Sequence, residues 1–156
     1  GDWYSLDAPL NTIPLLIREG AILPGQSPGR TTTESRKNHF ELLITISQQP
    51  KRISTGSLYW DDGDSDMPIA VQSSLLVNFR VDSGRILINS WSHLGPPSIK
   101  ETLILGRIEI MGVNNIVENV TVNGKFINTY FYNETNKYLV ITDLRIDMTK
   151  LFQVTW

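Results

Sequence analysis

Short stretches rich in β-branched and aromatic residues recur along most of this chain, with turn-forming residues between them. None sustains the i, i+3, i+4, i+7 spacing of apolar side chains that indicates a helix with one buried face. The pattern therefore predicts strands. They span residues 40–46, 56–60, 75–81, 85–89, 102–111, 117–122, 129–132, 138–142 and 152–156. Many short strands joined by tight turns are typical of an antiparallel β-sandwich, an all-β fold.

Three segments between these stretches have the composition of tight turns. Asp82-Ser83-Gly84, Val122-Asn123-Gly124 and residues 133–136 carry the Asn, Asp and Gly that turns between strands favour. Residues 143–150 are compatible with a single helical turn.

Two further apolar runs, residues 13–17 and 21–23, lie near the start of the chain, on either side of the polar Arg18-Glu19-Gly20. We expect both runs to be strands. A hairpin this small cannot bury both of its faces. Residues 1–30 are therefore expected to be the end of a proximal β-domain that is incomplete in this chain. We expect residues 31–156 to form the sandwich as a distal domain, and residues 9–24 to dock onto the preceding domain.

Composition excludes several classes of function. The chain has 156 residues and 40% hydrophobic content, enough for a sizeable core. No apolar run approaches the roughly 18 residues that span a bilayer, so no membrane contact is expected. The formal net charge of −2, without long like-charge blocks, argues against nucleic acid as a partner. Arg30, Arg36 and Lys37 are expected to lie in a solvated loop.

The absence of cysteine excludes disulfides, thiolate nucleophiles and sulfur-ligated metals together. No basic segment followed by an apolar one opens the chain, so no signal peptide is visible. No G-x-S-x-G motif of a serine hydrolase occurs. His39 and His93 lie far apart in the sequence without ligand-spaced partners. We predict no metal site and no cofactor.

Four aspartates follow the predicted strand 56–60, namely Asp61, Asp62, Asp64 and Asp66. A pair of them could supply the two carboxyl groups, about 5–10 Å apart, that a glycosidase uses. A calcium loop is a second reading, but Met67 stands where glycine is needed and Ser73 where the bidentate glutamate is needed. We favour a third reading, in which the strand ends in a turn whose aspartates cap backbone N–H groups. No catalytic residue is predicted in this chain.

Six aromatic residues raise the possibility of sugar binding: Trp3, Tyr4, Tyr59, Trp60, Trp91 and Trp156. Tyr59 and Trp60 must point to opposite faces of a strand, so one of them is expected in the core. We expect core or inter-domain packing for the set. A carbohydrate-binding module would need an exposed aromatic platform, and an interaction sandwich without a role in sugar binding is a further alternative.

Two acceptor sequences for N-linked glycans occur, Asn119-Val-Thr121 and Asn133-Glu-Thr135. Either is usable if the chain passes through the secretory pathway. We rank Asn133 above Asn119, because Asn133 lies in a predicted turn and Asn119 at the start of a predicted strand.

Several motifs resemble, in one order, the animal α-glucosidases of glycoside hydrolase family 31, of the lysosomal and intestinal type. They are A-P-L-N-T-I-P-L-L-I-R-E-G-A-I-L-P at 8–24, T-T-T-E-S-R-K-N at 31–38, G-S-L-Y-W-D-D-G at 56–63, and residues 108–112, 120–124 and 152–156. The resemblance covers nearly the whole chain, which makes it far more specific than any single motif.

The resemblance implies a place after a catalytic (β/α)₈ barrel. This chain would then be the non-catalytic C-terminal part of a retaining glycosidase that releases glucose from the non-reducing ends of α-glucans. The catalytic carboxylates and the substrate would lie on the barrel, since no motif here matches theirs. The barrel and the proximal β-domain would be the partners, and the location would be lysosomal or extracellular.

The sequence departs from the family pattern just before Gly20. Where members often read L-H-x-R-G-G, this chain has Leu15, Leu16, Ile17, Arg18, Glu19 and Gly20. The turn conformation at Glu19 is affected, because a positive φ is strained for any residue other than glycine.

Overall fold

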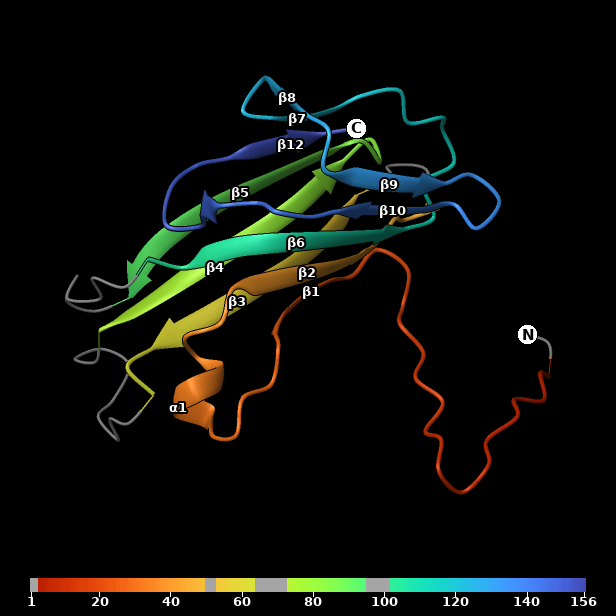
Figure 1. Cartoon of the computed structure of the whole chain (residues 1–156), viewed down its shortest axis with the longest axis horizontal. Coiled ribbons are helices and arrows are strands. Elements are labelled where there is room, and N and C mark those ends of the chain that lie inside the picture. The colour runs from red at the N-terminus through yellow and green to blue at the C-terminus, as the bar shows by residue number, and fades with distance from the viewer. Residues whose placement is uncertain (1–2, 50–52, 64–72, 95–101) are drawn as a thin grey trace.

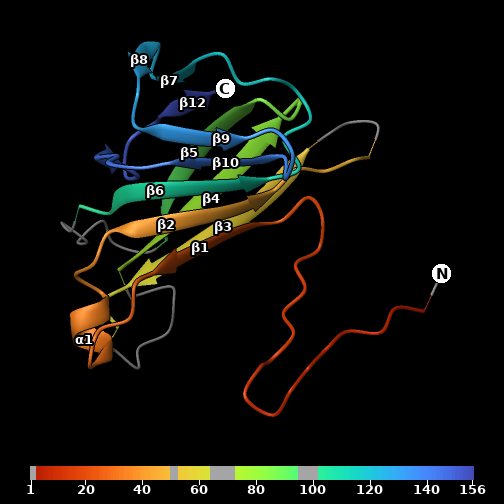
Figure 2. The same cartoon turned by 45° about the vertical axis from the view of Figure 1, so that its right-hand side comes forward.

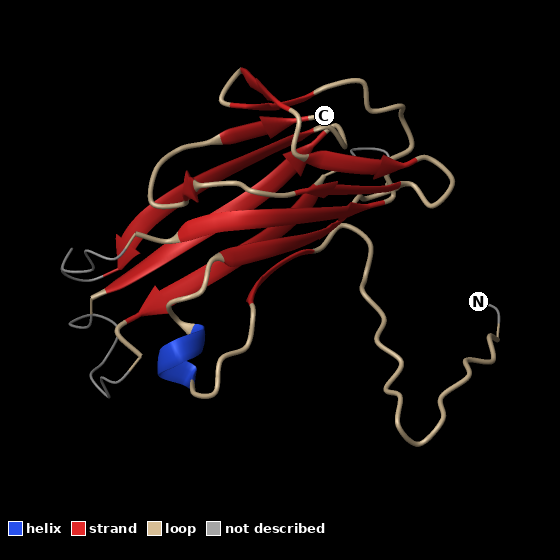
Figure 3. Cartoon of the chain, viewed as in Figure 1, coloured by secondary structure: helices blue, strands red, loops and turns tan. Residues whose placement is uncertain are grey.

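Two β-sheets stack face to face (Figures 1 and 3) in a computed structural model that describes residues 3–49, 53–63, 73–94 and 102–156. The first sheet has the order β1 (Ile22–Gln26), β2 (Phe40–Thr45), β6 (Ile104–Met111), β10 (Tyr138–Ile141) and β9 (Tyr130–Asn133), and β11 (Ile146–Asp147) also pairs with β6. The second has the order β3 (Ser54–Asp61), β4 (Ser74–Asp82), β5 (Ile86–Leu94), β12 (Gln153–Thr155), β7 (Val120–Val122) and β8 (Lys125–Ile127). One helical turn, α1 (Thr32–Ser35), lies between β1 and β2.

The predicted all-β sandwich is confirmed, with one correction to its topology. All pairs in the second sheet are antiparallel, but β2 and β6 of the first sheet run parallel. The chain leaves β2, builds β3 to β5 in the opposite sheet and then returns to β6. A connection of that length permits parallel pairing, which a tight hairpin does not.

The core follows from the alternation of side chains along each strand. Ile22, Ile44, Ile110 and Leu139 are cross-strand partners in one row of the first sheet, and all four are buried. Leu75, Val77, Phe79 and Val81, every second residue of β4, are buried on the second sheet. Because side chains alternate between faces with a period of two, each sheet turns one apolar face toward the other.

The predicted turns are confirmed. Ser83 and Gly84 have φ of 52° and 69°, and Asn123 and Gly124 have φ of 50° and 77°, as tight turns between strands require. Residues 134–137 form the turn between β9 and β10.

The single helical turn over 143–150 is wrong, because Ile146 pairs with Leu105 and is buried, and β11 forms there instead. Three elements were not predicted: α1, β8 and β11. Each is only two to four residues long, too short for its periodicity to be read from the sequence.

The first of the two predicted N-terminal strands, residues 13–17, is wrong for this chain. Residues 3–20 contain no strand and extend away from the sandwich (Figures 1 and 2). Ile13, Leu15 and Leu16 are each more than 80% exposed. A strand needs a neighbouring strand for its hydrogen bonds, and no described strand lies beside this segment.

The second predicted strand exists but belongs to the sandwich. β1 continues through Pro24 and Gly25 and pairs with β2 along its whole length. Ile22 is only 2% exposed, so the expectation that it needs a surface outside this chain is wrong. Glu19 avoids positive φ, and Gly20 takes it instead at 77°.

The residues around the start of β1 hydrogen-bond to both sheets. Gly20 N–H donates to Thr45 O at 3.1 Å, and Thr45 N–H donates to Ala21 O at 2.9 Å. On the other side, Thr55 N–H of β3 donates to Gly20 O at 3.0 Å, and Ala21 forms a parallel bridge with Thr55. This short piece of backbone therefore closes one edge of the sandwich.

Gly56 permits this closure. A Cβ atom at position 56 would lie 1.9 Å from the carbonyl oxygen of Ile22, far inside van der Waals contact. The close approach of two backbones explains why a strand interior carries a glycine.

Gly56→Ala is expected to lower the free energy of unfolding by at least about 2 kcal/mol, because β1 must move away from β3. Gly25→Ala is the matched control. Gly25 has no positive φ, and a Cβ there meets no atom within 4 Å. Thermal unfolding followed by circular dichroism measures both. Equal midpoints for the two variants would contradict the closure argument.

Candidate functional site

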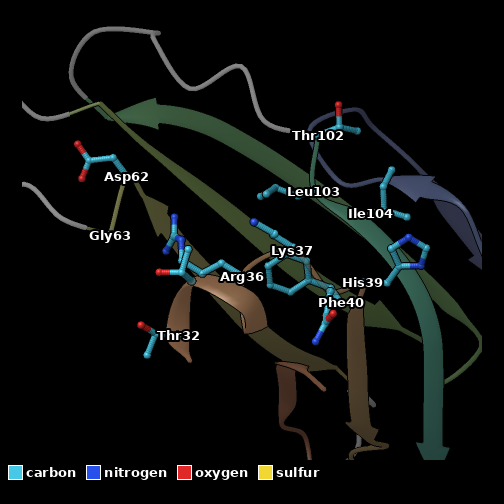
Figure 4. Close-up of a pocket in the computed structure, with 12 residues that line it drawn as sticks. Thr32, Arg36, Lys37, His39, Phe40, Asp62, Gly63, Thr102, Leu103 and Ile104 are labelled. Atoms are coloured by element: carbon cyan, nitrogen blue, oxygen red, sulfur yellow. The ribbon is translucent and has the colours of Figure 1, made fainter. Parts of the chain in front are cut away.

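A groove of about 770 Å³ lies where the chain after α1 meets the end of β3 and the start of β6 (Figure 4). Arg36, Lys37 and His39 line it from one side and Asp62 and Gly63 from the end of β3. Leu103 and Ile104 contribute the apolar part of the lining. The groove brings together the two motifs at 31–38 and 56–63, which are separate in the sequence.

Local hydrogen bonds build the helical turn that carries Arg36. Thr31 is the N-cap, and its hydroxyl accepts from Glu34 N–H at 3.2 Å. The Glu34 carboxylate accepts in return from Arg30 N–H at 2.9 Å, and Ser35 Oγ accepts from Gly29 N–H at 2.8 Å. This reciprocal arrangement resembles a capping box and fixes the direction in which the chain enters the helical turn.

Arg36 is locked against the end of β3. Its guanidinium lies 3.7 Å from the centroid of the Trp60 ring, a cation–π contact, and its Nη2 donates to the carbonyl of Asp61. Gly63 lies so close that a Cβ there would be 3.0 Å from the guanidinium carbon. Phe40 packs edge-on against Trp60 with ring centroids 5.3 Å apart. The expectation of a solvated Arg36 is therefore wrong, because the Trp60 ring provides a surface for the guanidinium.

The interpretation of Asp61 as a turn-capping residue is confirmed. Asp61 Oδ1 accepts from Gly63 N–H at 2.9 Å and lies 3.9 Å from Arg36 Nη1. Among the described lining residues of the groove, Asp62 is the one carboxylate. A retaining glycosidase needs two, so the described lining of the groove does not supply a catalytic pair. Asp64, Asp66 and Met67, needed for the glycosidase and calcium alternatives, lie outside the described residues.

The candidate aromatic residues do not form one platform. Trp60 is buried, as expected of one member of the Tyr59–Trp60 pair, and Tyr59 is 41% exposed. Tyr59 pairs with Leu76 and Trp91 with Val77, so these two exposed rings point to opposite faces of the second sheet. Trp91 instead packs edge-on against His93, with ring centroids 5.6 Å apart.

The remaining aromatic residues lie elsewhere. Trp3 and Tyr4 are in the exposed N-terminal segment, and Trp156 packs against the core. His39 is in the groove and His93 on β5, so the two histidines are not brought together.

The described residues contain no group of three or more His, Asp or Glu side chains that could hold a metal ion. In the same part of the chain, no helix has the length and apolar character needed to cross a membrane.

Both glycan acceptor candidates are accessible. Asn119 is exposed and lies one residue before β7. Asn133 is the last residue of β9 and half-buried, and its Oδ1 accepts from Asn136 N–H at 3.0 Å. That bond leaves Nδ2, the atom that carries a glycan, unengaged.

A polar cluster that sequence reasoning missed lies on the outer face of the first sheet. The Tyr138 hydroxyl donates to Glu109 Oε2, and Arg107 Nε donates to Glu109 Oε1 at 2.7 Å. These two hydrogen bonds hold the pKa of the Glu109 carboxyl below its ordinary value, with that from Tyr138 the larger cause. Because the three residues come from two strands, only the register between β6 and β10 reveals the cluster.

Comparison with known proteins finds relatives along the whole chain. Lysosomal alpha-glucosidase of Mus musculus is 33% identical over 156 residues, which covers 100% of this chain and 16% of that protein. Glucoamylase 1 of Schwanniomyces occidentalis is 33% identical over 99% of the chain, and intestinal sucrase-isomaltase of Oryctolagus cuniculus is 31% identical over 97%. No protein-family profile matches the chain.

The fold also has a solved counterpart. A crystal structure of the glucosidase II alpha subunit superposes with a TM-score of 0.72 at 22% identity, covering 97% of this chain and 18% of that one. The chain therefore spans about a sixth of the length of the first relatives, at their C-terminal end.

Arg36→Met is expected to destabilise the fold by about 1 kcal/mol, because it removes the cation–π contact and the bond to Asp61 while keeping an apolar side chain over Trp60. Arg30→Met is the control, since the Arg30 side chain makes no hydrogen bond or ion pair among the described residues. Urea unfolding midpoints distinguish the two. Equal loss in both variants would mean that general charge, and not the contact with Trp60, is responsible.

Glu109→Gln is expected to destabilise the protein at neutral pH and progressively less as the pH falls. A carboxyl with a lowered folded-state pKa contributes stability that is fully present above its ordinary pKa of 4.5. That contribution disappears as the pH falls through the folded-state pKa. Thermal midpoints of the parent and variant between pH 7 and pH 3 test the sign. A difference that grows toward acid pH would contradict the assignment.

Proposed function

Because the chain is homologous to the C-terminal part of the α-glucosidases of glycoside hydrolase family 31, we propose that it is the non-catalytic C-terminal β-domain portion of a retaining α-glucosidase. The enzyme releases glucose from the non-reducing ends of α-glucans. This sandwich packs on the catalytic (β/α)₈ barrel and the proximal β-domain of the same enzyme. The observation that carries the proposal is that the full chain is similar to only about a sixth of the length of the mouse lysosomal alpha-glucosidase and of the Schwanniomyces occidentalis glucoamylase 1.

The exposed N-terminal segment supports a packing role. Leu10, Ile13, Leu15 and Leu16 are all more than 80% exposed. Burying one such side chain contributes roughly 1.5–3 kcal/mol. A contiguous set of them in water would be an aggregation-prone patch, so a surface of a neighbouring domain is the natural partner.

We propose a different boundary between the two domains, and the pairing of β1 supports it. β1 pairs with β2 and contributes Ile22 to the core, although it precedes residue 31. We therefore assign residues 3–20 to the proximal β-domain and place the beginning of the distal sandwich at Ala21 instead of residue 31.

In this proposal the groove at Arg36 is a structural contact between the chain after α1 and the end of β3, and not a catalytic centre. Asp61 is held by Gly63 and Arg36, and the cleft that binds the α-glucan lies on the barrel. The chain needs no cofactor for this role. A carbohydrate-binding module is less well supported, because Tyr59 and Trp91 face opposite ways. We place the enzyme in the lysosome or outside the cell, since its relatives include a lysosomal α-glucosidase.

Leu16→Asp in the full enzyme is expected to lower its thermal midpoint and its yield, because a charge replaces an apolar side chain at the interface between domains. The kcat and KM of the folded fraction should stay unchanged, since the residue does not touch substrate. Differential scanning calorimetry and kinetics on maltose measure the two effects.

Leu151→Asp is the control for this experiment. Leu151 is 73% exposed and lies on the sandwich itself, so its change should leave stability nearly unaltered. A Leu16→Asp enzyme as stable as the parent would contradict the proposal.

A further inference from the structure

A hollow of about 450 Å³ lies at the end of the sandwich that carries Trp156. The turn between β4 and β5, the segment before β7 and the C-terminal residue meet there (Figures 1 and 2). The hollow is lined by Arg85, Asn115, Ile116, Glu118, Asn119 and Trp156.

The lining has polar groups without partners beside apolar surface. The side chains of Arg85, Asn115, Glu118 and Asn119 make no hydrogen bond or ion pair with any other described residue. Ile116 is 71% exposed. Guanidinium, carboxylate and amide groups beside an aliphatic and an indole side chain suit a sugar, which has both hydroxyl groups and an apolar C–H face.

One residue of the lining is itself a glycan acceptor. Asn119 belongs to Asn119-Val-Thr121, is exposed and precedes β7 by one residue. The next residues are held firmly, because Val120 is fully buried and the hydroxyls of Thr121 and Thr155 are hydrogen-bonded at 2.6 Å. The backbone N–H of Trp156 donates to the carbonyl oxygen of Arg85 at 3.2 Å, which holds these two lining residues together. A glycan on Asn119 would therefore start in a hollow whose backbone is held in place on two sides.

We propose that Asn119 carries an N-linked glycan whose first N-acetylglucosamine packs in this hollow. Its acetyl methyl and C–H face contact Ile116 and Trp156, and its polar groups bond to Asn115, Glu118 and Arg85. The inference rests on the proposed function only for passage through the secretory pathway.

The attachment is a transfer from a lipid-diphosphate-linked oligosaccharide. A bond forms between Asn119 Nδ2 and C1 of the sugar, and the bond from C1 to the diphosphate oxygen breaks. One amide proton passes to a base, and the lipid diphosphate leaves with the bonding electrons.

Asn133 provides a matched comparison within the same chain. Its sequon lies in the turn between β9 and β10, where Glu134, Thr135 and Asn136 are all exposed. Asn133 does not line the hollow. A glycan there would project into solvent without a seat on the protein.

The test uses the full enzyme with Asn133→Gln, expressed through the secretory pathway of a host that keeps glycans of the high-mannose type. Intact glycopeptide mass spectrometry gives the occupancy of Asn119. One sample is treated with an endoglycosidase that leaves the first N-acetylglucosamine, and another with an amidase that removes the whole glycan. Asn119→Gln in the same background corrects for every other glycan of the enzyme.

We expect Asn119 to be occupied. We also expect the amidase, but not the endoglycosidase, to lower the thermal midpoint by more than in the Asn119→Gln background. Ile116→Ala should leave occupancy unchanged and abolish most of that difference.

Equal midpoints after both treatments would overturn the inference, and so would a bare Asn119 on an enzyme that is glycosylated elsewhere. Both outcomes leave the proposed function intact. An enzyme that its own host keeps in the cytosol, without any glycan, would overturn the inference together with the proposed location.

Discussion

The fold depends on one close approach of two backbones. Gly20 and Ala21 hydrogen-bond to β2 on one sheet and to β3 on the other, and the Ile22 carbonyl occupies the space that a Cβ at Gly56 would need. Most sandwiches leave the gap between their sheets to be filled by side chains alone. Here the backbone itself crosses the gap at one edge, so Ile22 enters the core while the peptide groups of the preceding Gly20 and Ala21 remain hydrogen-bonded.

Several residues of the motifs that resemble glycoside hydrolase family 31 have identifiable structural roles in this fold. Gly20 and Gly56 permit the closure, and Gly63 gives room to the Arg36 guanidinium above Trp60. Phe40 then supports Trp60 from the first strand after α1. Each of these residues is explained by packing or backbone geometry, without any reacting substrate. These residues therefore have architectural roles, in agreement with the non-catalytic role that we propose for the chain.

Sequence reasoning succeeded where neighbouring residues alone decide the outcome. The alternation in 75–81 predicted β4, and the adjacency of Tyr59 and Trp60 predicted that only one of them would be buried. It failed where a distant partner decides. Residues 13–17 have the composition of a strand but no strand beside them in this chain, and Arg36 looked solvated because its contact with Trp60 spans 24 positions. The parallel pairing of β2 with β6 and the Glu109 cluster likewise depend on register between strands far apart in the sequence.

The exposed segment and the closed edge are parts of one continuous backbone. Residues 3–20 lead into β1 through Gly20, whose φ of 77° sets the direction of the segment relative to the sandwich. Gly20 also hydrogen-bonds to both sheets, so the point at which the segment is anchored is the point at which the sandwich closes. A domain that holds residues 3–20 therefore reduces the fraying of β1, and a well-formed β1 reduces the entropy that the segment loses on docking. The two events stabilise each other through Gly20, which makes this junction the physical link between the sandwich and the rest of the proposed enzyme.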